Sequence, residues 1–185
     1  NGDGIADGAC DCDGNVEDCA GVCGGSSEED ECGVCNGGGA DEGFDCAGNC
    51  VDASACGFAD LTFGAVTDSS VEILYSSNFD LGGFQFNTSG AELTGASSSL
   101  DAQFSSATGI VLGFSMSGAS LEAGSGSLAV LEFASTNDGG VLDVSNVVLT
   151  SSAAVTLASS GPGSVAFDGC YETDCAGTCY GDSVE

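Results

Sequence analysis

The segment GIVLGFSMSGASLEAGSGSLAVLEFAS, residues 109–135, decides the fold class. A period of two is typical of a strand with one buried face, whereas an amphipathic helix repeats every 3.6 residues. The stretch between its two apolar halves is rich in Gly and Ser, which favours a turn or loop. We therefore expect two strands here, each with one face toward a core. The alternating apolar positions are Ile110, Leu112, Phe114, Met116, Leu131 and Phe133.

The same alternation recurs on both sides of this segment. Val71, Ile73 and Tyr75 alternate with other residues in the same way, and so do the pairs Phe84/Phe86 and Val155/Leu157. We expect eight or nine short strands in all, because no stretch keeps a helical period. Strands of this kind, separated by turns rich in Gly, Ser, Asn and Asp, predict an antiparallel two-sheet β-sandwich.

Composition divides the chain into three regions. Residues 1–56 hold nine Cys and fourteen acidic residues, residues 57–169 hold no Cys, and residues 170–185 hold three Cys. The outer regions have too few apolar side chains to build a core, so cross-links or metal must order them. We predict a Cys-rich acidic segment at 1–56, a β-sandwich domain at 57–169, and a Cys-rich tail at 170–185 that continues the repeat into a next copy.

The charge of the chain excludes several functions. It has 29 acidic residues and no Lys, Arg or His. Binding to nucleic acid or to an anionic membrane depends on Lys and Arg, so neither is expected. No apolar run is long enough to span a bilayer, so no membrane insertion is expected. Without His or Lys, most nucleophilic and acid–base arrangements are unavailable, and we predict that the protein is not an enzyme.

Twelve cysteines in a short acidic chain indicate a disulfide framework, and therefore an extracellular or cell-surface location. A thiolate metal site is the alternative for the pair Cys32 and Cys35. The cysteine counts of the outer regions, nine and three, are both odd. If every Cys is oxidised, one disulfide must join the two regions, for example Cys56 to Cys170, or join two copies of the chain. The predicted disulfide cysteines are Cys10, Cys12, Cys19, Cys23, Cys32, Cys35, Cys46, Cys50, Cys56, Cys170, Cys175 and Cys179.

The first eighteen residues carry oxygen-bearing side chains at short intervals, with Gly between them. Calcium takes six to eight oxygen ligands in a flexible shell, and such strings can supply them. The alternative is a solvated acidic linker. We predict calcium as a cofactor, with ligands among Asn1, Asp3, Asp7, Asp11, Asp13, Asn15 and Asp18.

Asn87 begins the sequon Asn-Thr-Ser and is a predicted N-glycosylation site. It alternates with Phe84 and Phe86, so it should face away from the core. Few aromatic side chains are free to stack on sugars, because Tyr75 belongs to the core pattern. Surface glycans are therefore only a possible partner.

Two resemblances follow from the motifs. The words DCAGVCGG at 18–25, DECGVCNG at 30–37 and DCAGNC at 45–50 resemble the Cys-rich acidic repeats of large extracellular proteins of marine microbes. They are also similar to thrombospondin type 3 calcium repeats. The segments 81–98, 109–135 and 141–152 look like a cohesin-like sandwich. That resemblance implies a module that binds a dockerin, although related sandwiches serve as spacers or in adhesion.

A third copy, DCAGTC at 174–179, would join the Cys-rich start of a following copy into one continuous segment. This repetition predicts a structural subunit or repeat unit of an extracellular fibre or surface filament. Copies of the chain would be joined head-to-tail through disulfide- and calcium-stabilised linkers. The alternative is a cohesin-like or carbohydrate-binding adhesion module.

Overall fold

The computed structural model describes residues 5–170, so Asn1, Asp3, Cys175 and Cys179 lie outside the described residues. The chain forms two compact units, Asn1–Val51 and Asp52–Glu185. Within the described part, no helix combines the length and apolar character needed to cross a membrane. The only helix there is α1 (Ala53–Cys56), which Asp52 caps by accepting a hydrogen bond from the Ser54 amide.

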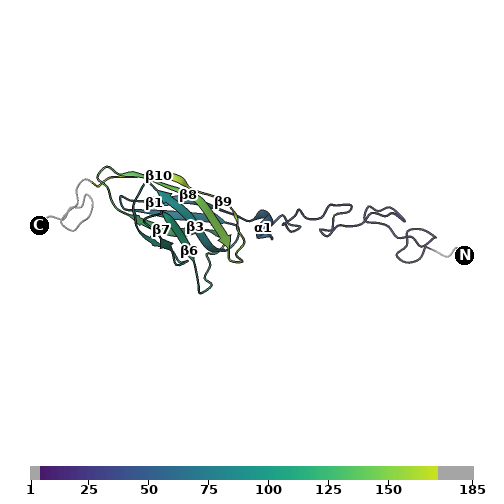
Figure 1. The fold of residues 1–185 in the computed structure, drawn as a ribbon. Coiled ribbons are helices and arrows are strands. Elements are labelled where there is room, and N and C mark those ends of the chain that lie inside the picture. Colours follow the sequence, from purple (N-terminus) through teal and green to yellow (C-terminus); the bar gives the residue numbers. More distant parts are fainter. Residues whose placement is uncertain (1–4, 171–185) are drawn as a thin grey trace. The chain divides into compact units, whose positions relative to one another are not determined.

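Ten strands of the second unit form two five-stranded sheets (Figure 1). Neighbouring strands are antiparallel except β1 and β9, which pair in parallel. The prediction of an all-β, two-sheet sandwich is confirmed. The first sheet has the order β4 (Leu93–Ser97), β7 (Gly124–Phe133), β2 (Ser70–Ser77), β1 (Phe58–Val66) and β9 (Ala158–Ser160). The second has the order β10 (Gly163–Phe167), β8 (Gly140–Ser151), β3 (Leu81–Ser89), β6 (Ile110–Phe114) and β5 (Gln103–Phe104).

The core lies between the sheets and follows most of the predicted alternation. Val71 and Ile73 on β2 are fully buried, and so is Phe86 on β3. The rings of Phe133 on β7 and Phe167 on β10 lie 4.5 Å apart, which joins the two sheets through an aromatic contact. Tyr75 is also buried, and its hydroxyl donates a hydrogen bond to the Glu122 carbonyl at 2.9 Å.

Strand β6 departs from the prediction. Ile110, Leu112 and Phe114, which were expected to face the core, point outward, and Phe114 is 51% exposed. The buried side chain of this strand is that of Val111. The physical reason is Gly113, the other inward position: a Cβ there would overlap the ring of Phe84. That ring fills the space over the strand, and the larger apolar side chains of β6 remain on the other side. Met116 lies beyond the end of the strand and is 88% exposed.

The first unit has no apolar core among its described residues. Residues 5–51 form no regular helix or strand, and only isolated bridges such as Glu17 with Cys23 and Glu29 with Cys35 pair the backbone. The valines of this segment are exposed, including Val22 and Val34. Order in this unit must therefore come from cross-links and polar contacts.

Candidate functional site

The outer surface of the second sheet carries exposed and half-buried apolar side chains. We call Ile110, Leu112, Phe114 and Val148 the apolar face. Val148, Gln85 and Leu112 lie in one row across β8, β3 and β6, and Phe114 pairs with Gly83 in the neighbouring row. Large apolar side chains that stay in contact with water on a sheet surface indicate an interaction site.

Two hollows follow this face. One, of about 380 Å³, is lined by Gly83, Gln85, Phe114 and Val148 among others, and the second, of about 190 Å³, is lined by Phe104 and Ile110. Leu112 borders both. None of the described residues that line the two hollows is ionisable. This face can therefore hold apolar groups of a partner.

The outer surface of the first sheet has a different character. Asp60 and Thr62 on β1 are exposed, and so is Glu132 on β7, which pairs with Ser70 at the start of β2. Phe58 on the same side of β1 is exposed as well, so the difference between the sheets is that the second carries several such apolar side chains on neighbouring strands.

Asn87 lies on β3, on the same outer side as the apolar face. It pairs with Ile110 on β6 and is half-buried, while the neighbouring Phe86 and Thr88 point into the core. Its orientation away from the core agrees with the sequence pattern. Glycosylation at Asn87 stays a prediction.

Three overlapping disulfides cross-link the Cys-rich unit. They join Cys10 to Cys23, Cys19 to Cys35 and Cys32 to Cys46, with Cα–Cα distances of 5.6, 5.4 and 5.2 Å. We call these three bonds the disulfide ladder. Each bond closes a ring that overlaps the next ring, so none of the close-spaced pairs among residues 5–170, such as Cys32 and Cys35, bonds within itself. Cys50, Cys56 and Cys170 also belong to disulfides.

The prediction that every cysteine is oxidised is wrong for Cys12. It is exposed and is the free cysteine among the described residues. The argument from odd counts required full oxidation, so it no longer holds. With Cys12 reduced, the other eight of the nine cysteines in residues 1–56 are an even number. A bond between Cys56 and Cys170, or between two copies, is therefore not required by cysteine counting.

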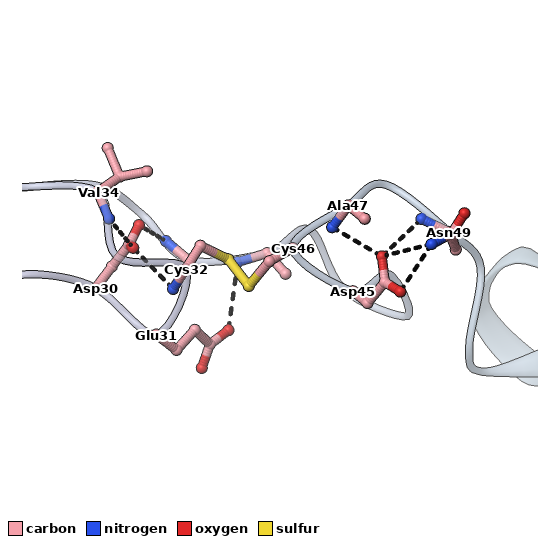
Figure 2. The surroundings of a disulfide bond; sticks show 10 residues. Asp30, Glu31, Cys32, Val34, Asp45, Cys46, Ala47 and Asn49 are labelled. Atoms are coloured by element: carbon pink, nitrogen blue, oxygen red, sulfur yellow. Dashed lines mark hydrogen bonds between the residues drawn. A yellow bond between two sulfur atoms is a disulfide. The ribbon is translucent and has the colours of Figure 1, made fainter.

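An aspartate organises the loop in each repeat of the Cys-rich unit. One carboxylate oxygen of Asp30 accepts hydrogen bonds from the amides of Cys32 and Val34, at 2.9 and 2.8 Å. Figure 2 shows Asp30 and Asp45 turned into their own loops, on either side of the Cys32–Cys46 disulfide. The carboxylate thus satisfies amides two and four residues ahead, as side chains do in Asx turns. The same pair of bonds occurs at Asp11, Asp18 and Asp45.

The second carboxylate oxygen is used in two ways. In Asp18 and Asp30 it accepts a more distant amide, from Ser27 at 3.0 Å and from Gly39 at 2.8 Å respectively. In Asp45 it accepts the side-chain amide of Asn49, and Asp11 has the same contact with its own asparagine. A glycine seven residues after Asp18 and after Asp30 makes the first arrangement possible. A Cβ on Gly25 or Gly37 would overlap the carboxylate.

These hydrogen bonds stabilise the charged form of the carboxylates. The Val34 amide, followed by that of Gly39, lowers the pKa of Asp30 below the ordinary value of 3.8. The Val22 amide does the same for the pKa of Asp18. For Asp45, the largest cause of the lowered pKa is the Asn49 side chain. In a chain with no cations, backbone and side-chain amides take the place of salt bridges.

The predicted calcium ligands do not converge on one point among the described residues. Asp11 and Asp18 face their own loops, and Asp7 and Asp13 are exposed. The metal-binding side chains that do come together there are Cys10, Asp11 and Cys23, and both of these sulfurs are already in a disulfide. The described residues therefore do not fit a calcium shell. Asn1 and Asp3 lie outside them, and calcium binding stays a prediction.

Acid should loosen these loops. Because the pKa of Asp30 is lowered in the folded state, its ionisation stabilises the loop at neutral pH, and this contribution is lost as the pH falls below 3.8. The protection of the Val34 amide, which is its exchange rate relative to that of an unstructured peptide at the same pH, is expected to fall over that range. In Asp30→Asn, which cannot titrate, protection at Val34 should not depend on pH in this way. Equal pH dependence of protection in both proteins would contradict the assignment.

No family model matches the chain, and no curated protein sequence matches it. Solved structures that resemble it in fold include the following three. A non-cellulosomal cohesin from the hyperthermophilic archaeon Archaeoglobus fulgidus has a TM-score of 0.44 and 15% identity, covering 62% of this chain and 91% of that one. The match to a type I cohesin–dockerin complex from Clostridium thermocellum has a TM-score of 0.44 and 12% identity, with coverages of 64% and 97%. A cohesin module of a family 33 glycoside hydrolase from Clostridium perfringens has a TM-score of 0.43 and 12% identity, with coverages of 61% and 96%.

Proposed function

We propose that this chain is a non-catalytic adhesion module of an extracellular assembly. The sandwich binds a partner protein through the apolar face, and the Cys-rich unit serves as a disulfide-stabilised connector. The observation that carries the proposal is the outward position of Phe114 and its neighbours on β6. The disulfides support an extracellular location, because such bonds persist in oxidising surroundings.

The chemistry of the surface defines the partner. Phe114 and Val148 are 51% and 41% exposed, which leaves rings and methyl groups available to pack against another apolar surface. The chain carries 29 acidic groups and no basic side chain. A partner with an apolar centre and a basic rim is therefore favoured, because opposite charges speed encounter and like charges oppose it.

A photo-crosslinking residue in place of Phe114 tests this role. In the extracellular fraction of the source organism, we expect irradiation to join the chain to one predominant protein, which mass spectrometry identifies. The matched control carries the same residue in place of Thr62, which is exposed on the outer side of β1. Adhesion through the apolar face predicts the adduct from position 114 alone. The same adducts from both positions, or none from position 114, would refute it.

A second candidate is a subunit that polymerises head-to-tail through its Cys-rich ends. The observation that favours it is the exposed free thiol of Cys12 within a unit whose other described cysteines are all bonded. A copy of the chain would then be the partner, and Cys12 would take part in the covalent joint. In a head-to-tail joint, the Cys12 thiol of one copy is oxidised together with a tail thiol, Cys175 or Cys179, of the next copy. Mild oxidation should then give a ladder of oligomers on a non-reducing gel, which Cys12→Ser should abolish, whereas a product no larger than a dimer would mean that Cys12 bonds only to Cys12. A ladder that persists in Cys12→Ser would exclude Cys12 from the joint.

A further inference from the structure

We propose that the disulfide ladder makes the Cys-rich unit a tension-bearing link, which cannot be drawn out while its bonds are oxidised. The inference rests on connectivity within this unit alone. It goes beyond the binding role of the sandwich and does not depend on that role. It concerns force applied along the chain, which any connector in an extracellular assembly transmits.

Covalent bonds are the main resistance that this unit can offer. Its valines are exposed, and its described residues form no regular strand or helix that would have to unfold. Loops with few buried apolar contacts open at low cost in free energy. The three disulfides, in contrast, join distant points of the chain at Cα–Cα distances between 5.2 and 5.6 Å.

The shortest route for tension bypasses most of the backbone. Force that enters at Cys10 crosses directly to Cys23. It can then follow the chain forward to Cys32 and cross to Cys46. Alternatively, it runs back to Cys19, crosses to Cys35, and runs back again to Cys32 before the same final crossing.

These two routes have nearly equal lengths. Without disulfides, the chain from Cys10 to Cys46 extends to about 130 Å, at about 3.6 Å per residue. With the ladder intact, the same extended spacing along the peptide gives about 41 Å for the route through Cys19 and Cys35, and about 43 Å for the route that omits them. The ladder therefore withholds about 90 Å of chain from extension.

The three bonds consequently have unequal mechanical roles. Loss of Cys19–Cys35 lengthens the limit by only about 2 Å, because the other route remains. Loss of Cys10–Cys23 lengthens it by about 12 Å, and loss of Cys32–Cys46 by about 24 Å. Cys10–Cys23 and Cys32–Cys46 therefore set the maximum extension of the link. Cys19–Cys35 limits that extension chiefly when one of the other two bonds is lost.

Optical tweezers can measure this on the full chain. Azide-bearing residues in place of Asp7 and Val51, both exposed, serve as attachment points outside the ladder. A Cys12→Ser background prevents thiol exchange. Addition of a phosphine reductant under tension is expected to lengthen the tether by about 90 Å. Oxidised Cys32→Ser/Cys46→Ser should exceed its oxidised parent by about 24 Å, while Cys19→Ser/Cys35→Ser should match the parent within about 2 Å.

Two results would overturn the proposal. One is an oxidised parent that already extends by about 90 Å without reductant. The other is an equal gain in length in the two double variants, with peptide mapping showing the remaining ladder bonds unchanged. Even if a variant forms the wrong disulfides, the lengthening of the parent on addition of reductant still tests the proposal. Neither result bears on crosslinking at Phe114, so the two proposals can fail separately.

Discussion

Replacing Phe86 by alanine is expected to lower the free energy of unfolding of the sandwich by about 3–5 kcal/mol. Phe86 is fully buried on β3 and stacks with Phe84, with ring centroids 5.7 Å apart. Its removal leaves a cavity between the two sheets that the surrounding side chains fill only in part. Urea denaturation followed by circular dichroism measures the change.

Phe114 provides the matched control, because it is also a phenylalanine on a strand of the second sheet. Its side chain faces outward, so Phe114→Ala should change the free energy of unfolding by about 0.5 kcal/mol or less. A loss of stability as large as that from Phe86→Ala would place Phe114 in the core. That result would remove the observation on which the proposed binding role depends.

The second large effect is expected from the Cys-rich unit. Replacing Cys32 and Cys46 together by serine opens a ring with a sequence separation of 14 residues. In the chain-entropy model this costs about 3 kcal/mol of stability. Hydrogen exchange of the amides between these two positions measures the loss, since the unit lacks a core whose unfolding could be followed optically.

Cys12→Ser is the control for this variant. Cys12 is a free thiol in the same unit, so its replacement should leave the exchange rates of residues 32–46 unchanged. Faster exchange in Cys12→Ser, of the size seen in the double variant, would mean that Cys12 is cross-linked. Unchanged exchange in the double variant would show that the bond contributes no order.

The alternation in the sequence was sufficient to predict the fold class, because burial of one strand face leaves a period of two. It failed to predict the direction of β6. Ile110, Leu112 and Phe114 satisfy the pattern, but the period does not say which face meets the core. That direction depends on the ring of Phe84 above Gly113, a contact between two strands that local sequence does not contain. The apolar face was therefore hidden within a correctly predicted strand.

The aspartates of the Cys-rich unit show a different limit. The sequence reveals carboxylates at regular intervals, and oxygen-rich strings suggest calcium. The signal that distinguishes the observed role is the placement of Gly and Cys after each aspartate. Gly33 has a φ of 75° and follows Asp30 by three residues, which allows the loop to turn back around the carboxylate. The disulfide pairing could not be derived in this way, because several connectivities satisfy the same spacing.

The central claim is that overlapping disulfides and amide-bound carboxylates order a unit without a core. An amide NMR spectrum of the oxidised protein at neutral pH, recorded with a calcium chelator, tests it most directly. The claim predicts that the amides of Val22, Val34 and Asn49, which donate to the aspartates, stay dispersed with the chelator and lose dispersion only after reduction. Collapse of these signals in the chelator, with recovery on adding calcium, would contradict it.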